Sequence, residues 1–182
     1  KSVVVGYDVR PSSIEILNAL TKGINSMGAK VYSIGLCGTE EIYFATNHLE
    51  TDAGVMITAS HNPADYNGLK IVGKGAKPVS MNSGLGEIKK IADQSESNLL
   101  AESHIEVVDI KAAYIEKLLE FIDSDAIKPM HIVTNAGNGC AGPILDLLEE
   151  RLPLKFTKIQ NDPDGTFPNG IPNPLLPENR DI

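Results

Sequence analysis

The sequence predicts an α/β protein: mixed, largely parallel sheets with helices on both faces, stacked in three αβα layers and divided between two similar domains. Residues 1–36 and 130–159 both favour this class, because each has the strand–helix–strand pattern of a parallel βαβ unit. At 182 residues and 42% hydrophobic content, the chain can bury a core. We place the two domains at residues 1–108 and 109–182.

The first domain is expected to alternate short buried strands with amphipathic helices. Ser12 and Glu15 have the spacing of a capping box, and Thr39 is expected to cap the next helix. The run at 69–72 follows the strand before it so closely that it should be antiparallel to it. The expected strands are 3–6, 30–35, 54–57 and 69–72, and the expected helices are 12–28, 39–48 and 84–92. Residues 95–98 are expected to be weakly structured, and 105–108 to be an extended connector between the domains.

The second domain is expected to open on a helix capped by Asp109, followed by strands at 130–134 and 154–159. Between them, the turn 135–139 feeds a helix that begins near Gly142-Pro143. Its glycines could cradle a phosphate, but tight backbone packing at a strand–helix crossing is the simpler explanation. Residues 161–174 are rich in turn formers and are expected to form a surface loop.

Charge and composition exclude several classes of protein. A net charge of −8 argues against a nucleic-acid partner and gives no basic surface for a membrane. Cys37 and Cys140 lack metal-ligand spacing, which indicates free thiols in a reducing compartment. With neither a signal peptide nor a spanning segment in view, we expect a cytoplasmic location.

The stretch Thr58-Ala59-Ser60-His61-Asn62-Pro63 carries the most specific chemistry in the chain. An apolar strand delivers it, and the residue before Pro63 is disfavoured from helical geometry, so Ser60 and His61 should lie in a turn at the strand's end. Ser60 offers a hydroxyl nucleophile, while His61 and Lys70 offer positive charge or proton transfer. A polar turn that merely ends the strand is the alternative.

This pattern closely resembles the active-site serine loop of the α-D-phosphohexomutases, in which the serine carries a phosphoryl group. Three further blocks resemble the same family in the same order: Gly6-Tyr7-Asp8-Val9-Arg10, residues 135–142 and residues 164–169. Within the family, residues 38–46 and the stretch from Pro172 to Glu178 are similar to the bacterial phosphomannomutases of GDP-mannose and exopolysaccharide biosynthesis.

The resemblance implies residue roles and a reaction. Ser60 would be the phosphoserine and a ligand of Mg²⁺, with its other three ligands in a further domain. His61 and Lys70 would flank the transferring phosphoryl group, and Arg10 would lie near the same strand ends. The implied reaction interconverts mannose 1-phosphate and mannose 6-phosphate, a hexose phosphate substrate, through a hexose 1,6-bisphosphate.

The resemblance also leaves questions open. We expect a fragment that is inactive alone, because the family's N-terminal arginine segment, metal loop and fourth domain have no counterpart here. Phosphoglucomutase and phosphoglucosamine mutase are alternatives, as is a non-catalytic module that binds sugar phosphate. A Ser-His hydrolase is disfavoured, since Ser60 lacks G-x-S-x-G and neighbours on an extended chain point to opposite faces. The oligomeric state is open.

Overall fold

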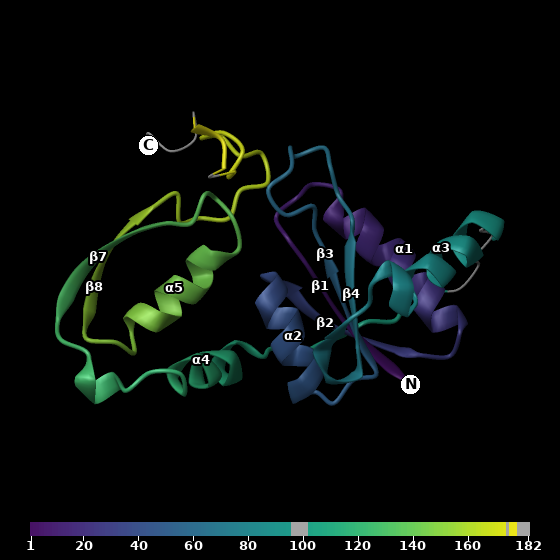
Figure 1. Cartoon of the computed structure of the whole chain (residues 1–182), viewed down its shortest axis with the longest axis horizontal. Coiled ribbons are helices and arrows are strands. Elements are labelled where there is room, and N and C mark those ends of the chain that lie inside the picture. The colour runs from purple at the N-terminus through teal and green to yellow at the C-terminus, as the bar shows by residue number, and fades with distance from the viewer. Residues whose placement is uncertain (96–101, 174, 178–182) are drawn as a thin grey trace.

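The computed structural model describes residues 1–95, 102–173 and 175–177, which form two α/β units connected through helix α4 (Lys111–Leu119) (Figure 1). Most of the expected weakly structured segment 95–98 lies outside the described residues, as do Pro174 and Glu178 of the last family block. No helix in these ranges has the length and apolar character needed to cross a bilayer.

The first unit is built on a mixed sheet whose strands run in the order β5-β4-β3-β1-β2-β6. Strands β1, β2, β3 and β6 are parallel, and β4 is antiparallel to β3, as the short connection predicted. The strands are β1 (Ser2–Tyr7), β2 (Lys30–Leu36), β3 (Ala53–Ile57), β4 (Leu69–Gly73), β5 (Lys77–Pro78) and β6 (Glu106–Val107).

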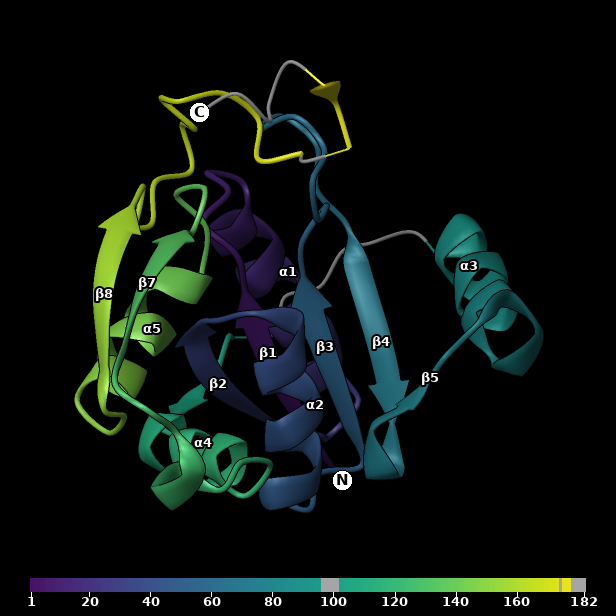
Figure 2. The same cartoon turned by 60° about the vertical axis from the view of Figure 1, so that its left-hand side comes forward.

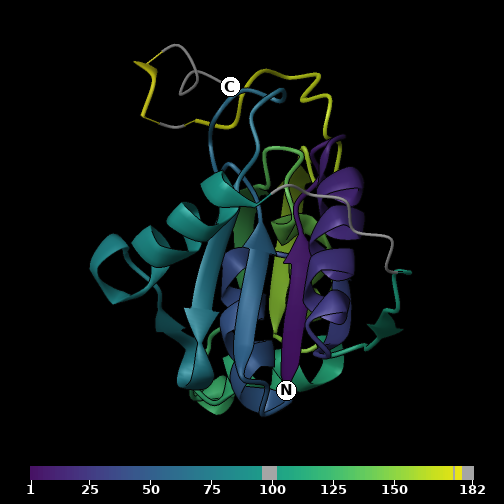
Figure 3. The same ribbon diagram turned by 90° about the vertical axis from the view of Figure 1, so that its right-hand side faces the viewer.

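Helices α1 (Ser13–Ser26) and α2 (Thr39–His48) cover opposite faces of this sheet, which confirms the predicted three layers (Figure 3). The alternation of side chains along β1 explains the arrangement. Val4 points into the core under α2, its neighbour Val5 points into the core under α1, and both are fully buried. Because β1 is buried on both faces, its sequence is a continuous apolar run and does not alternate between apolar and polar residues.

Helix α3 (Leu85–Gln94) forms where expected, but none of its residues is buried. Its apolar side chains Ile88 and Ile91 are largely exposed, and the helix stands clear of the sheet (Figure 3). Helical periodicity therefore predicted the element correctly but not its packing, since a stripe identifies a face and not its partner.

The second unit pairs β7 (Met130–Asn135) with β8 (Leu154–Ile159) in parallel, with α5 (Ala141–Glu149) crossing between them. Figure 2 shows α5 beside this pair, with α4 below it. The strand–helix–strand pattern expected here is confirmed. The expected connector 105–108 is more than a connector, because β6 within it extends the first sheet by pairing with β2.

Two predicted helix caps are wrong. The hydroxyl of Ser12 makes no capping bond and instead accepts a hydrogen bond from Asn67 Nδ2 at 3.0 Å. Thr39 is already helical, and Gly38 is the cap residue, whose N–H donates to the Glu41 carboxylate at 2.7 Å. The Thr39 hydroxyl instead accepts a hydrogen bond from Lys70 Nζ at 3.4 Å. In both cases a contact with a residue distant in the chain has replaced the expected bond within the helix.

One isoleucine of α2 and one of α3 give a matched test of this packing. Ile42 is fully buried, whereas Ile91 is 59% exposed. We expect Ile42→Ala to lower the free energy of unfolding by about 2–5 kcal/mol through lost burial and a cavity. Ile91→Ala should change it little. Urea unfolding followed by circular dichroism measures both, and equal losses would contradict the packing described here.

Candidate active site

The candidate site lies where the parallel strands β1, β2 and β3 end at one edge of the first sheet. Ser60 follows β3, and its side chain lines a cleft of about 160 Å³. Thr39, at the start of α2, lines the same cleft, and the second unit contributes Cys140. Phe167 also lines it and comes from the C-terminal tail, by which we mean the described residues that follow β8 (160–173 and 175–177). Strand ends of this kind are where open α/β sheets bind ligands.

Ser60 is exposed and sits in an unusual backbone conformation. Its φ is +58°, in the left-handed region that costs a non-glycine residue roughly 1 kcal/mol or more. Its N–H donates to Thr58 Oγ1 at 2.8 Å, and its Oγ lies 3.3 Å from His61 Nδ1. The expectation that Ser60 and His61 point to opposite faces is therefore wrong, because the chain is not extended here.

A buried carboxylate, Asp8, organises the residues behind Ser60. Its oxygens accept hydrogen bonds from Thr58 Oγ1 at 2.6 Å and from Ser13 Oγ at 3.1 Å. They also accept from the backbone N–H and Nε of Arg10. Asp8 follows β1, Thr58 follows β3 and Ser13 opens α1, so this one side chain ties three elements together.

Arg10 holds the serine loop from inside. Its side chain has no exposed surface, and Nε forms an ion pair with Asp8 at 3.0 Å. The four remaining donor hydrogens point to backbone carbonyls of the loop: those of Ser60 (2.8 Å), Asn62 (2.7 Å), Tyr66 (3.0 Å) and Pro63. A guanidinium has five donors, and all are used by the protein. Arg10 lies near the strand ends as expected, but it has no donor left for a substrate.

Lys70, unlike His61, does not lie next to Ser60. It lies on β4 opposite Met56 and is exposed, and its ammonium donates to Thr39 Oγ1. Thr39 lines the cleft, so Lys70 reaches the edge of the site through this hydroxyl. The structure therefore brings Ser60 and His61 into contact, places Arg10 beneath them, and leaves Lys70 at the rim.

Both cysteines line the cleft beside Ser60 and are free thiols. Burial raises the pKa of the Cys140 thiol to about 12, and it raises the pKa of Cys37 further. Both groups are therefore protonated at neutral pH. Because the thiolate is the reactive form of cysteine, Ser60 is the better nucleophile candidate in this cleft.

No group of three or more His, Cys, Asp or Glu side chains within the described ranges could hold a metal ion. Ser60 could contribute one ligand, through a phosphoryl oxygen once it is modified. Mg²⁺ requires near-octahedral oxygen coordination, so its other ligands would have to come from groups beyond this cleft or from water.

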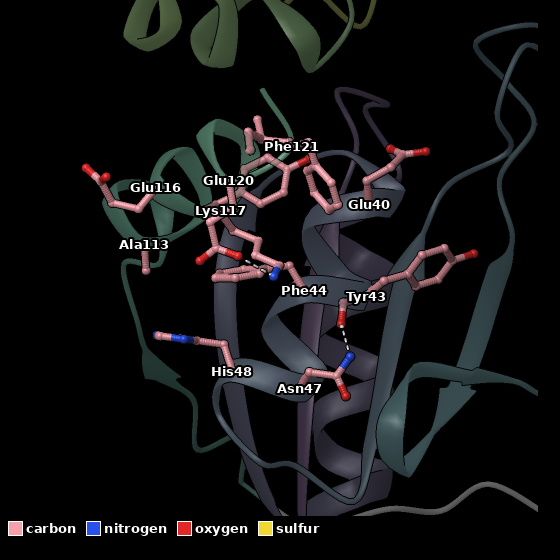
Figure 4. Close-up of a pocket in the computed structure, with 12 residues that line it drawn as sticks. Glu40, Tyr43, Phe44, Asn47, His48, Ala113, Glu116, Lys117, Glu120 and Phe121 are labelled. Carbon is pink, nitrogen blue, oxygen red and sulfur yellow. Dashed lines mark hydrogen bonds and ion pairs between the residues drawn. The ribbon is translucent and has the colours of Figure 1, made fainter. Parts of the chain in front are cut away.

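A larger hollow of about 870 Å³ lies between α2 and α4 (Figure 4), and Ser60 is not among the residues that line it. It is lined mainly by apolar and aromatic groups, with Phe44 stacked on His48 at 5.0 Å and tilted against Tyr114. Ion pairs at its edge, such as Lys117 with Glu120, are already satisfied. Size alone would favour this hollow, but reactive groups converge only at the smaller cleft among the described residues.

Comparison with known proteins agrees with the geometry at the strand ends. Residues 1–99 match the family model "Phosphoglucomutase/phosphomannomutase, alpha/beta/alpha domain I", and residues 112–181 match domain II of the same family. The chain belongs to the phosphoglucomutase/phosphomannomutase family. The boundary that we place between residues 108 and 109 falls between the two matches and stays a prediction.

Curated relatives and solved structures support the same assignment. A phosphomannomutase of Salmonella typhimurium is 49% identical over the whole chain, which spans 41% of that protein. A Xanthomonas campestris protein named phosphohexose mutases is 50% identical over 98% of the chain and 40% of its own length. A phosphoglucomutase/phosphomannomutase family protein of Burkholderia thailandensis superposes with a TM-score of 0.83 at 34% identity, covering all of this chain and 40% of that one. The chain therefore spans about two fifths of these relatives.

Sequence reasoning missed the support behind the serine. The sequence indicated Asp8, Thr58 and Phe167 only as members of family motifs, with Phe167 in a loop, and gave none of them a role of its own. A polar residue at a buried position would have signalled this support. However, the sequence does not show which polar residues at the end of a strand are buried.

Arg10 and Arg151 allow a matched test of loop support. Arg10→Lys replaces a buried five-donor fork with a three-donor ammonium and leaves part-buried carbonyls of the loop unpaired. We expect a loss of about 2–4 kcal/mol in unfolding free energy. Arg151→Lys removes a guanidinium whose Nη1 pairs with Glu116 at the surface, and it should leave the unfolding midpoint almost unchanged. Thermal unfolding compares them, and equal small effects would argue against the buried fork.

Proposed function

We propose that this chain provides the phosphoserine half of a phosphomannomutase, which interconverts mannose 1-phosphate and mannose 6-phosphate. The observation that carries the proposal is the Ser60 hydroxyl, exposed at the edge of a cleft and 3.3 Å from His61 Nδ1. A hydroxyl that receives and returns a phosphoryl group must be reachable from solvent and held in one direction. Membership of the phosphoglucomutase/phosphomannomutase family supports this activity.

In the proposed reaction the Oγ–P bond of phosphoserine breaks as a bond forms between phosphorus and a free hydroxyl of the sugar phosphate. The sugar hydroxyl loses its proton to a base, and Ser60 Oγ regains a proton. His61 is placed to supply that proton, since its Nδ1 already faces Oγ. The hexose 1,6-bisphosphate then turns within the cleft and returns its other phosphoryl group to Ser60.

Lys70 and Arg10 take different parts in this proposal. Phosphoryl transfer spreads negative charge over three oxygens, so a nearby cation lowers the barrier. Lys70 is an exposed cation that reaches the edge of the cleft through its contact with Thr39, and we assign it this electrostatic part. Arg10 positions the loop and does not contact the substrate. Mg²⁺, when bound, would supply further positive charge at the phosphoserine.

Alternatives remain within and outside the family. Phosphoglucomutase and phosphoglucosamine mutase would use the same serine, and the ratio of kcat/KM for the three hexose phosphates distinguishes them.

The contact between Ser60 and His61 makes a hydrolase more plausible than the sequence suggested. However, no carboxylate in the described residues orients the other ring nitrogen of His61, which a Ser-His relay requires. A cytoplasmic location belongs to the proposal and fits two free thiols.

Phosphoryl uptake by Ser60 is the direct test. The protein that carries this chain with the remaining family domains is incubated with glucose 1,6-bisphosphate, and its intact mass is measured. We expect a gain of one phosphoryl group mapped to Ser60, absent in Ser60→Ala and retained in Ser26→Ala, which alters an exposed serine of α1. A gain on another residue, or none in an active enzyme, would refute the proposal.

The chain of residues 1–182 alone should not turn over mannose 1-phosphate. Its described residues contain no cluster that could hold Mg²⁺, and Ser60 supplies one ligand at most. A coupled assay for mannose 6-phosphate, with the intact relative from Salmonella as the positive control, measures this. Conversion that exceeds the Ser60→Ala background would show that the chain is complete in itself.

A further inference from the structure

The Arg10 guanidinium lies against one aromatic ring. The N–H groups at the edge of the guanidinium are all engaged with Asp8 and the loop carbonyls, which leaves its planar faces for a further contact. Arg10 Cζ lies over the ring of Phe167, 5.6 Å from the ring centroid, and Phe167 is only 8% exposed. A cation–π contact of this kind is stronger when water is excluded, as it is here.

Phe167 belongs to the C-terminal tail, whose described residues run beside the tip of the serine loop (Figure 2). The tail is fixed to the second unit by Asn138, whose side chain donates to the Asp162 carbonyl and accepts from Asn169 Nδ2, both at 2.9 Å. The backbone of Asn138 adds an acceptor for the Asp164 N–H at 2.8 Å. Phe167 is thus presented by a segment that the glycine turn of the second unit holds.

The same tail fits closely against the first unit. A Cβ added to Gly165 would lie 1.9 Å from the Val9 carbonyl oxygen, so only glycine allows this approach. Phe167 itself has a φ of +49°, a strained conformation for a residue with a side chain. Close approach and backbone strain together indicate that the ring is held over Arg10 by the surrounding structure.

We propose that Phe167 is a positioning residue for the phosphoryl-accepting serine. It acts through Arg10: the ring fixes the guanidinium plane, the guanidinium fixes four loop carbonyls, and the loop holds Ser60 in its left-handed conformation. The second unit thereby sets the geometry of a serine that belongs to the first. The inference rests on the proposed function of Ser60.

Amide hydrogen exchange followed by NMR tests this on the chain itself. The Ser60 amide, bonded to Thr58 Oγ1, reports on the loop, and the Val5 amide in β1 reports on the core. In Phe167→Leu we expect the Ser60 amide to exchange about tenfold faster relative to Val5. The Arg10 Nε–H resonance should also lose its ring-current shift. Phe167→Tyr, which keeps the ring, should restore both signals.

Phe121→Leu is the matched control. Phe121 also lies under a cation, with Lys117 Nζ 5.5 Å from its ring centroid, but it is 75% exposed and remote from the cleft. Phe121→Leu should leave the exchange rate of the Ser60 amide unchanged.

If Phe167→Leu does not fold, Phe167→Met, whose side chain is closer in length to phenylalanine, is measured instead. If neither folds while Phe167→Tyr does, Phe167 is a general structural residue and the proposal is wrong.

The outcomes separate this inference from the proposed function. Equal acceleration of the Ser60 and Val5 amides in Phe167→Leu would overturn the inference, because it would indicate global destabilisation only. Phosphoryl uptake from glucose 1,6-bisphosphate, measured on the protein with the remaining family domains, is a separate arm and should be about tenfold slower in Phe167→Leu. No uptake in the parent would overturn the proposed function, while the exchange result would still decide how the loop is held.

Discussion

The buried ion pair of Asp8 and Arg10 is the interaction on which the serine loop depends. A charged group out of water is costly unless every donor and acceptor is paired. Here the carboxylate collects hydroxyl and amide hydrogens from three elements, and the guanidinium meets four carbonyls of one loop. Any other conformation of the loop would leave some of these buried charges and loop carbonyls unpaired. Because that would cost free energy, the irregular loop is held in one conformation.

That constraint has a chemical consequence at Ser60. The loop holds the serine at a positive φ, which turns its Oγ toward His61 of the same strand end. Had the chain continued as a regular strand, the two side chains would have pointed to opposite faces. The strain at Ser60 thus supplies the Ser-His contact, and the buried network behind it offsets the strain.

Residues from both units line the cleft. Cys37 and Thr39 approach from the end of β2 and the start of α2, while Gly139 and Cys140 approach from the glycine turn of the second unit. The glycine turn was interpreted as tight packing or as a phosphate cradle. The close approach of Pro172 to Gly137 favours packing, since a Cβ at Gly137 would lie 2.8 Å from Pro172 Cβ. Its neighbours nevertheless border the site.

The sequence by itself determined the order and kind of the main helices and strands, though not the short strands β5 and β6, and it placed the serine at the end of β3. Apolar runs, periodicity and a proline after the strand are local signals, and they are physically sufficient for such features. Only the tertiary structure decided that Arg10 faces inward, that Thr39 binds Lys70 instead of capping its helix, and that α3 stands clear of the sheet. Each of these depends on groups distant in the chain, because a hydrogen bond or a packing contact goes to whatever partner folding brings within reach.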